Sequence, residues 1–287
     1  MKTYPKVFIV VLNYNGAQVI KQCLSSLFNL EYPNFSVVVV DNDSKDGSFE
    51  MAKNQFGRAY FIKNEKNLGF ATGNNVGIRF SLERGADWVW LLNNDTEVDP
   101  SSLKELVFQG EKAGAGILSP VIFERDGEKI WFAGGRIDWL RMKVVHFQRA
   151  ISEEFYLSDF ITGCAMLVKK DVFKKIGLLD EDFFLYYEDA DFGERARRAG
   201  FKKGVATRSW IYHFENSQKD FSGKLYWLVL SGLLFFKKDS FGLKKIWIWL
   251  LIFLRRMKNI KNLVFKKEEK SRVIRRAFKD FKKASHE

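Results

Sequence analysis

The amino-acid sequence predicts an α/β protein with a mixed, mostly parallel sheet flanked by helices and a helical C-terminal tail. Segments 6–12 and 36–40 are continuous runs of mainly β-branched residues, which is typical of strands buried on both faces of a parallel sheet. Between them, segment 17–30 places apolar side chains at helical spacing, so the three segments form a βαβ unit. The last quarter of the chain differs, because it combines apolar runs with a large excess of positive charge.

The alternation of strands and helices continues to about residue 115, and shorter strands follow. Pro100, directly after Asp99, fits a proline in the first turn of a helix. This order predicts a Rossmann-like sheet with ligands at the carboxyl ends of its strands. We expect further helices at 46–55, 72–84, 100–113 and 189–200, strands at 59–62 and 88–92, and shorter strands at 117–123, 129–132, 144–148 and 159–168.

The composition excludes several classes of protein. The 287 residues are 46% hydrophobic and 29% charged, which fits a globular chain with a sizeable core. Two cysteines and three histidines are too few for a disulfide framework or a Cys/His zinc module. The first apolar run continues into Asn-Tyr-Asn-Gly, so we interpret it as a strand and not as a signal peptide. Since no run reaches about 18 apolar residues, we expect no membrane-spanning helix.

The net charge of +12 is concentrated in the tail, residues 219–287. The tail has 19 Lys and Arg against 6 Asp and Glu, a balance of +13, which leaves residues 1–218 at −1. Its apolar runs, 226–236 and 246–254, are flanked by basic residues, and 266–283 continues as a mostly charged helix. Such a tail could bind nucleic acid, but a duplex cannot bury its Trp-rich apolar surface. A membrane surface accommodates both features, and the remaining alternative is that the runs cover the domain or form a dimer interface.

Polar clusters follow the expected strands where functional loops are predicted. The cluster at 41–44, Asp-Asn-Asp-Ser, could bind a base or a ribose, or could cap the next helix. The Gly- and Asn-rich segment 67–75 could bring backbone N–H groups close to a phosphate. The chain lacks Gly-x-Gly-x-x-Gly after the first strand and has no P-loop, which argues against a dehydrogenase or a P-loop NTPase. A nucleotidyltransferase is also disfavoured, because the cluster at 13–16 contains no basic residue.

Three further features are candidates for chemistry. Asp95 ends an apolar strand, where it could bind a hard divalent cation or cap a helix. Glu188, Asp189 and Asp191 form a dense acidic group after an aromatic run, more than a helix N-terminus needs. His213 ends another apolar run and is either structural or a neutral imidazole ligand of a metal.

Six motifs occur in order along roughly residues 6–218. They are Asn13-Tyr-Asn-Gly, Val40-Asp41-Asn-x-Ser44-x-Asp46-Gly47, Asn67-x-Gly69-Phe-Ala-x-Gly73-Asn-Asn75, Leu92-Asn-Asn-Asp95, Gly163-x-x-Met-Leu-Val168, and Leu178-x-Asp180-Glu-x-Phe-Phe184 with Glu188-Asp189-x-Asp191. Each motif alone is weak. Together they resemble the family 2 inverting glycosyltransferases of the GT-A type, especially the rhamnosyltransferase-like branch.

The resemblance implies a nucleotide-diphosphosugar donor and a Mg²⁺ or Mn²⁺ ion. It implies that Asp189 is the catalytic base, that Glu188 and Asp191 support the acceptor pocket, and that Asp95 and His213 bind the metal. Asp41 would lie near the nucleotide base. Residues 1–115 would form the nucleotide-sugar-binding half of a domain spanning 1–218, residues 116–218 its acceptor-binding half, and 219–287 a membrane-association tail. The residues implied to bind the donor are Asn13, Asn15, Asp41, Asn67, Gly69, Asn74, Asn94 and Asp95.

The chain departs from the family pattern in two places. The metal motif reads Asn93-Asn94-Asp95 instead of Asp-any-Asp, and the Gln-x-x-Arg-Trp signature of processive members is absent after residue 191. The second departure favours transfer of a single sugar. We therefore expect an enzyme on the inner face of the cell membrane that uses a dTDP- or UDP-sugar, with rhamnose favoured by the resemblance. Its acceptor would be a membrane-bound or lipid-linked saccharide in surface polysaccharide or cell-wall synthesis, and we expect no nucleic-acid partner.

Overall fold

The computed structural model describes residues 4–214, 221–265 and 269–284, so the expected domain boundary after residue 218 lies outside the described residues. The strands are β1 (Val7–Asn13), β2 (Phe35–Asp41), β3 (Tyr60–Lys63), β4 (Trp88–Asn93), β5 (Thr96–Val98), β6 (Ala115–Glu124), β7 (Ile130–Phe132), β8 (Gly135–Asp138), β9 (Lys143–His146), β10 (Phe155–Leu157), β11 (Ala165–Lys169) and β12 (Lys202–His213). The helices are α1 (Ile20–Leu27), α2 (Ser48–Gln55), α3 (Gly69–Glu83), α4 (Ser102–Ala113), α5 (Lys170–Ile176), α6 (Glu188–Arg198), α7 (Phe221–Lys238), α8 (Leu243–Phe265) and α9 (Glu269–Ala284).

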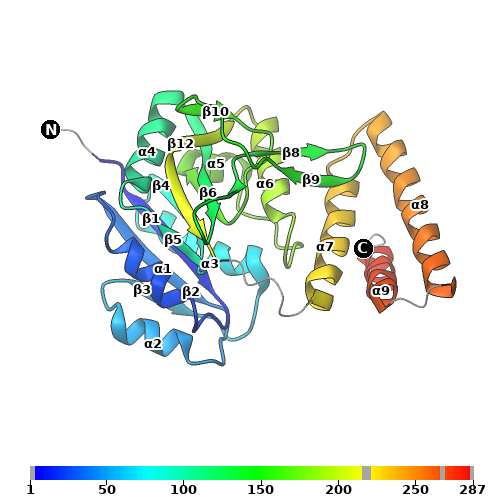
Figure 1. The fold of residues 1–287 in the computed structure, drawn as a ribbon, viewed down its shortest axis with the longest axis horizontal. Coiled ribbons are helices and arrows are strands. Elements are labelled where there is room, and N and C mark those ends of the chain that lie inside the picture. Colours follow the sequence, from blue (N-terminus) through cyan, green and yellow to red (C-terminus); the bar gives the residue numbers. More distant parts are fainter. Residues whose placement is uncertain (1–3, 215–220, 266–268, 285–287) are drawn as a thin grey trace.

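The predicted α/β architecture is confirmed. One mixed sheet has the strand order β10-β12-β6-β11-β4-β1-β2-β3, with β5 paired to β12 and β7 paired to β6 (Figure 1). Strands β3, β2, β1 and β4 run parallel to one another. The continuous apolar run of β1 is buried on both faces: Val7, Ile9 and Val11 belong to one core layer, and Phe8 and Val10 to the other. This placement explains why β1 lacks the alternation of a one-faced strand.

The second half of the sheet is mixed. Its strands β5, β10 and β12 are not among those expected from the sequence, and one expected strand is shorter. Strand β11 pairs antiparallel with both β4 and β6, while β12 runs parallel to β6. The strand expected over 159–168 begins only at Ala165, which lies opposite Leu92 of β4. The preceding residues are held elsewhere, because Phe160 N donates to Gly135 O (3.0 Å) at the base of the separate β8–β9 hairpin. The turn between these two attachments lines the cavity described below.

Helix α3 packs unusually close to the sheet. This close packing accounts for Gly73, in the segment 67–75, and for Gly77, two residues beyond it. A Cβ atom on Gly77 would lie 2.4 Å from Cγ1 of Val10, and one on Gly73 would lie 2.6 Å from Cδ1 of Leu12. Any larger side chain at these positions would push the helix off the strand. Part of the glycine content that suggested a phosphate loop is therefore required by helix–sheet packing.

The two apolar runs of the tail have different environments. In α7, Leu230, Leu233, Phe235 and Phe236 are buried in the same core layer as the sheet, so this run covers the body of the protein. Helix α8 lies farther from the sheet, on the outer side of α7 (Figure 1), and much of its apolar surface is exposed. Among the described residues, no helix is both long enough and apolar enough to span a bilayer.

Candidate active site

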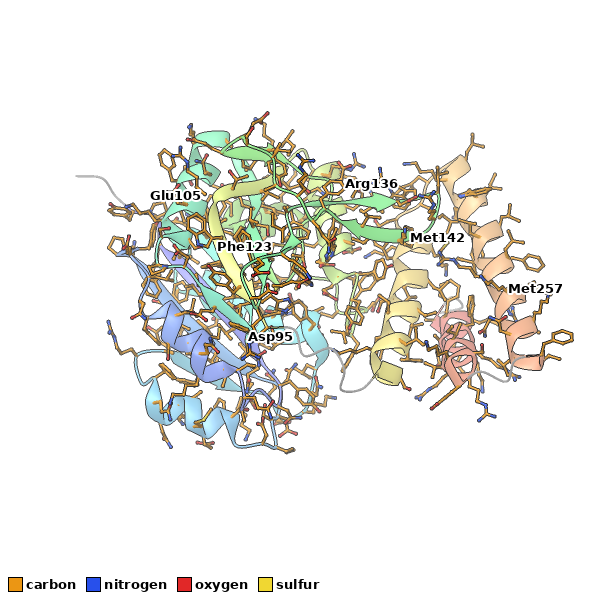
Figure 2. The ribbon with its side chains drawn as sticks, viewed as in Figure 1. Asp95, Glu105, Phe123, Arg136, Met142 and Met257 are labelled. Atoms are coloured by element: carbon orange, nitrogen blue, oxygen red, sulfur yellow. The ribbon has the colours of Figure 1, made fainter. Side chains whose placement is uncertain are left out.

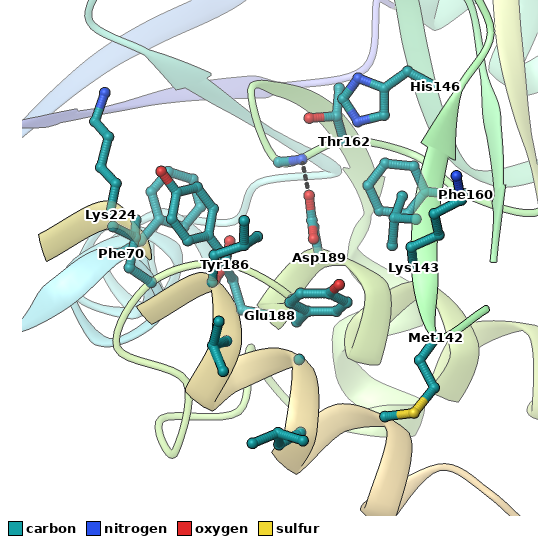
Figure 3. A pocket seen from close by; sticks show the side chains of 18 of the residues that line it. Phe70, Met142, Lys143, His146, Phe160, Thr162, Tyr186, Glu188, Asp189 and Lys224 are labelled. Carbon is teal, nitrogen blue, oxygen red and sulfur yellow. Dashed lines mark hydrogen bonds between the residues drawn. The ribbon is translucent and has the colours of Figure 1, made fainter. Parts of the chain in front are cut away.

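A cavity of about 870 Å³ lies between the sheet and the C-terminal helices. It is lined by the end of β4, strand β9, the turn before β11, the start of α6, and helices α7, α8 and α9 (Figure 3). Four residues that the sequence predicted to take part in the chemistry lie in its wall, namely Asp95, Glu188, Asp189 and His213. The fold therefore brings together groups that are more than 100 positions apart in the chain.

Asp95 and His213 are placed side by side by strand pairing. Strand β5 pairs antiparallel with β12, so Thr96 lies opposite His213, and Phe214 N donates to Asp95 O (2.8 Å). As a result, Nε2 of His213 lies 3.3 Å from Oδ1 of Asp95. The indole of Trp131 packs edge-on against the imidazole, with ring centroids 4.6 Å apart. Two potential metal ligands are thus fixed by backbone geometry.

The chemistry of the Asp95–His213 pair fits a divalent cation. Among the described residues, Nδ1 of His213 is buried without a hydrogen-bond partner, and the only polar contact of the buried Asp95 Oδ1 is the one to His213. A carboxylate and an imidazole are both accepted ligands of such cations. The described part of the chain has no group of three or more His, Cys, Asp or Glu side chains suited to a metal. A cation at this pair would therefore complete its coordination with substrate oxygens or water.

The protonation of His213 bears on this fit. Burial lowers the pKa of His213, but the neighbouring Cys164 and Asp95 outweigh burial and raise the pKa to about 11. The carboxylate of Asp95 thus favours the protonated imidazole in the metal-free protein. A cation bound by an imidazole nitrogen of His213 would have to displace the proton on that nitrogen, which makes metal binding dependent on pH.

Asp189, the second residue of α6, points its carboxylate into the centre of the cavity (Figure 3). Its Oδ2 accepts a hydrogen bond from Gly163 N (2.8 Å), and its Oδ1 accepts one from Ala190 N (2.8 Å). Burial raises the pKa of Asp189 to about 6, although these two N–H groups favour the charged form. A carboxylate with such a pKa is ionised at neutral pH and is a stronger base than an ordinary one.

The turn that presents Asp189 is held in an unusual conformation by α7. Tyr186 and Tyr187 have φ values of +69° and +68°, a left-handed conformation that bulky residues rarely adopt. The ring of Tyr187 packs against Gly232, where an added Cβ would lie 3.1 Å from its Cε2 atom. In the same helix, Ser231 Oγ donates to Leu185 O (2.8 Å). The surrounding contacts with α7 thus maintain the conformation that directs Asp189 into the cavity.

The other two acidic residues of the group have different surroundings. Glu188 is buried, and burial together with the charges of Asp189 and Asp191 raises its pKa well above the usual range. Asp191 is completely buried and does not line the cavity, which differs from its predicted place in the acceptor pocket. Its Oδ2 accepts from Arg195 Nε (2.7 Å), and its Oδ1 accepts from Lys238 Nζ (2.6 Å). Asp191 therefore ties α6 to the end of α7.

Three residues predicted to bind the donor form one hydrogen-bond network at the carboxyl ends of β1, β2 and β4. Nδ2 of Asn13 donates to Oδ1 of Asp41 (2.8 Å), and Nδ2 of Asn94 donates to Oδ1 of Asn13 (2.8 Å). Asp41 is completely buried, and it also accepts from the backbone N–H of Ser44 (2.8 Å). The network joins three strand ends and fixes the loops that follow them.

The remaining residues predicted to bind the donor lie in the neighbouring loops. Asn15 N donates to Ser44 Oγ (2.9 Å), and Asn67 Oδ1 accepts from the backbone N–H of Gly69 (2.9 Å). Asn74 lies within α3 and donates to Phe70 O (3.0 Å). Of the eight residues predicted to bind the donor, only Asp95 lines the cavity.

The sequence prediction missed the basic residues that line the cavity from the tail. Lys224 on α7 and Arg255 and Lys258 on α8 all lie in the wall. Arg255, Lys258 and Asn262 have the spacing i, i+3, i+7, which places them on one face of a helix. That spacing is a signal in the sequence that could have identified these residues.

The strand order and the site at the strand ends define a fold of the GT-A type. Residues 8–177 match the sequence model of the family described as glycosyl transferase family 2, and the chain therefore belongs to that family.

Several curated proteins are similar in sequence. Low-salt glycan biosynthesis hexosyltransferase Agl10 of Haloferax volcanii is 30% identical over 68% of this chain and 63% of its own length. The dTDP-rhamnosyl transferase RfbF of Shigella flexneri is 27% identical over 68% of this chain and 64% of its own. N-acetylglucosaminyl-diphospho-decaprenol L-rhamnosyltransferase of Mycobacterium tuberculosis is 26% identical over 71% of this chain and 75% of its own. The matches to the first two relatives thus span less than two thirds of their length.

Two solved structures share the fold at low sequence identity. GalNAc-T7, solved with UDP, GalNAc and Mn²⁺, superposes with a TM-score of 0.65 at 17% identity, over 80% of this chain and 48% of that one. Staphylococcus aureus TarS 1-349, in complex with UDP-GlcNAc, superposes with a TM-score of 0.62 at 16% identity. The TarS match covers 96% of this chain and 80% of the other, so it includes the C-terminal helices.

Proposed function

We propose that the chain is an inverting glycosyltransferase that transfers a single sugar, with rhamnose favoured, from a nucleotide diphosphosugar. The proposed acceptor is a membrane-bound or lipid-linked saccharide in surface polysaccharide or cell-wall biosynthesis. The observation that carries this proposal is the position of Asp189 in the same cavity as the Asp95–His213 pair. The names of the relatives support the substrate classes: one is a dTDP-rhamnosyl transferase, and another acts on a diphospho-decaprenol-linked sugar. The lack of Gln-x-x-Arg-Trp supports transfer of one sugar.

In the proposed reaction, Asp189 takes the proton of an acceptor hydroxyl as that oxygen attacks the anomeric carbon. The bond between the anomeric carbon and the diphosphate oxygen breaks on the opposite face, which inverts the configuration. The raised pKa of Asp189 strengthens it as a base, and the N–H groups of Gly163 and Ala190 orient its carboxylate. Placing base and acceptor correctly before reaction is a large part of the expected rate enhancement.

Asp95 and His213 would bind Mg²⁺ or Mn²⁺ on the donor side. When bound, the cation supplies positive charge to the departing diphosphate. We expect Asp95→Ala to abolish Mn²⁺-stimulated binding of dTDP and UDP in calorimetry. Asp171→Ala is the control, because Asp171 is exposed at the start of α5, near the end of β4 that is opposite to Asp95; it should bind both nucleotides as the wild type does. Unchanged Mn²⁺-stimulated binding by Asp95→Ala would remove the metal role from this pair.

The direct test of the proposed function is a panel of dTDP- and UDP-sugars with Mn²⁺ or Mg²⁺, read by release of the nucleoside diphosphate. Product NMR then gives the anomeric configuration of the transferred sugar. We expect Asp189→Asn to lose transfer while it retains a cooperative unfolding transition. Near-normal transfer by a folded Asp189→Asn variant, or a product with retained configuration, would refute the assignment.

We also propose that α8 binds the surface of an anionic membrane. Its outward face exposes Ile246, Phe253 and Leu254, with exposed fractions of 69%, 58% and 50%, next to Lys and Arg side chains. Such a face can insert its apolar residues among acyl chains while its basic residues contact anionic headgroups.

Flotation with phosphatidylglycerol vesicles tests the membrane contact. We expect the wild type to float and Ile246→Ser/Phe253→Ser to lose most of its flotation. Phe108→Ser replaces an equally exposed aromatic residue on α4, and it should float as the wild type does. Equal flotation of all three proteins would contradict the proposal.

A further inference from the structure

The cavity has a basic wall that the proposed chemistry does not use. Lys224 and Lys258 line it without an ion pair or side-chain hydrogen bond to any described residue. Arg255 donates only to two backbone carbonyls, Arg141 O (2.5 Å) and Met142 O (3.4 Å), and has no carboxylate partner among the described residues. The pKa of Arg255 is lowered by burial, which reflects the cost of its charge there. Arg255 and Lys258 lie one turn apart on α8 and have no direct carboxylate partner among the described residues, so this part of the basic wall indicates a site for an anion.

The surfaces next to this basic wall are apolar. Helix α7 contributes Leu228, Val229 and Leu233, and helix α9 contributes Ile274 and Phe278. Since a purely ionic ligand would gain nothing from these side chains, the shape and chemistry of the cavity fit an amphiphile with a charged group and an apolar chain.

The part of the basic wall on α8, Arg255 and Lys258, is separate from the Asp95–His213 pair. The guanidinium of Arg255 donates a hydrogen bond to Met142 O (3.4 Å). Figure 2 shows Met142 beside α7 and well apart from Asp95. Helix α8, which carries Arg255 and Lys258, lies on the outer side of α7, away from β1, β2 and β3 (Figure 1). An anion at this wall is therefore not the diphosphate held by a cation at Asp95.

We propose that Arg255 and Lys258 bind the phosphate or diphosphate group of a lipid-linked acceptor, whose apolar chain lies against α7 and α9. This inference rests on the proposed function, because it identifies the anion as part of the acceptor. The ionised Asp189 repels an anion. The basic wall therefore holds the phosphate away from the base while the attached sugar reaches Asp189. The C-terminal helices then provide the acceptor site of the enzyme.

The test is binding of farnesyl diphosphate, which combines a diphosphate with an apolar chain, measured by calorimetry on the full chain. Arg255→Gln/Lys258→Gln removes two charges from the cavity face of α8. Arg256→Gln/Lys261→Gln removes two charges from the same helix at positions that do not line the cavity. We expect the first variant to bind farnesyl diphosphate at least about 10-fold more weakly and the second to bind as the wild type does, since charge-assisted hydrogen bonds are lost only in the first.

Two further ligands distinguish the sources of the anion. Farnesol, which has no diphosphate, should bind both variants and the wild type equally weakly. Binding of dTDP with Mn²⁺ should be unchanged in Arg255→Gln/Lys258→Gln, because the nucleotide site is separate. A parallel loss of dTDP binding would assign the basic wall to the donor and overturn the inference, as would unchanged farnesyl diphosphate binding.

Lys258→Gln alone guards against a folding artefact, because Arg255 also anchors the β8–β9 hairpin. This single variant should show a smaller loss of farnesyl diphosphate affinity with an unchanged unfolding transition; no loss would count against the inference. The binding experiment is independent of turnover. If no nucleotide sugar is used by the protein while farnesyl diphosphate binding follows these charges, the proposed function fails but the anion site stands.

Discussion

Replacing Asp189 should change the pH dependence of stability as well as remove activity. Its pKa is raised from 3.8 to about 6 on folding, chiefly by burial. A group whose pKa is raised on folding binds its proton more tightly in the folded state. The stability that it contributes is therefore complete below pH 3.8 and is lost as the pH rises through 6. In the wild type, the buried charge of Asp189 destabilises the fold at neutral pH.

The size of the effect follows from the shift. At 1.36 kcal/mol for each pKa unit, the ionised Asp189 costs about 3 kcal/mol of unfolding free energy, of which about 2 kcal/mol develops between pH 4.5 and 7.5. An asparagine side chain has only one carbonyl oxygen, so Asp189→Asn leaves the N–H of Gly163 or Ala190 without its acceptor. That loss costs about 1 kcal/mol, and it does not depend on pH.

Urea denaturation of both proteins at pH 4.5, 6.0 and 7.5 measures the difference directly. The unfolding free energy of Asp189→Asn, relative to the wild type, should rise by about 2 kcal/mol from the lowest to the highest pH. Groups that do not interact with Asp189, such as Asp180 with its lowered pKa, are common to both proteins and cancel. Glu188 does not cancel, because the charge of Asp189 raises its pKa; loss of that charge adds to the expected rise in the same direction. The exposed Asp182→Asn serves as the control and should give a constant difference. If the difference in unfolding free energy between Asp189→Asn and the wild type were also constant with pH, the raised pKa would be refuted. If that difference fell as the pH rose, the pKa of Asp189 would be lowered on folding and not raised.

Three further outcomes follow from the geometry. Lys238→Met should lower the unfolding free energy by about 1–3 kcal/mol in urea denaturation, because the buried Asp191 loses one partner, whereas Lys238→Arg should retain most of it. Gly77→Ala should destabilise by about 1–3 kcal/mol in the same assay, since its Cβ would lie 2.4 Å from Cγ1 of Val10; an unchanged midpoint would contradict the close packing. The turnover number should fall about tenfold for each pH unit below 6 as Asp189 is protonated, and a flat profile down to pH 5 would exclude it as the base.

The parts of the fold that the sequence predicted are those set by local pattern. The uninterrupted apolar run of β1 can bury all its side chains only if the strand lies between two core layers, and the structure places it there. The different surroundings of Asp189 and Asp191 could also be predicted from their spacing. Asp189 and Asp191 are two positions apart on a helix, about 200° around its axis, so they cannot face one cavity. Lys238, the partner of Asp191, lies 47 positions away, and no local pattern indicates that contact.

The basic residues that give the tail its net positive charge have different contacts in the structure. Lys238 on α7 pairs with Asp191 of α6, while Arg255 and Lys258 on α8 line the cavity. The apolar surface of α8 faces outward, where the sequence had suggested a membrane contact. The family match ends at residue 177, before α7 and α8, so it could not assign the basic residues of these two helices.

In the proposed reaction, the position of α7 links acceptor binding to catalysis. One part of this helix lines the cavity through Leu228 and Leu233, and its end is bonded to Asp191 through Lys238. Its middle packs on Tyr187, the residue before the acidic pair. Since α7 both contacts the proposed acceptor and supports the turn that presents the base, an acceptor that displaced α7 would also misplace Asp189. Discrimination between acceptors should therefore appear in the turnover number as well as in the Michaelis constant, because a poorly fitting acceptor moves the base away from its working position.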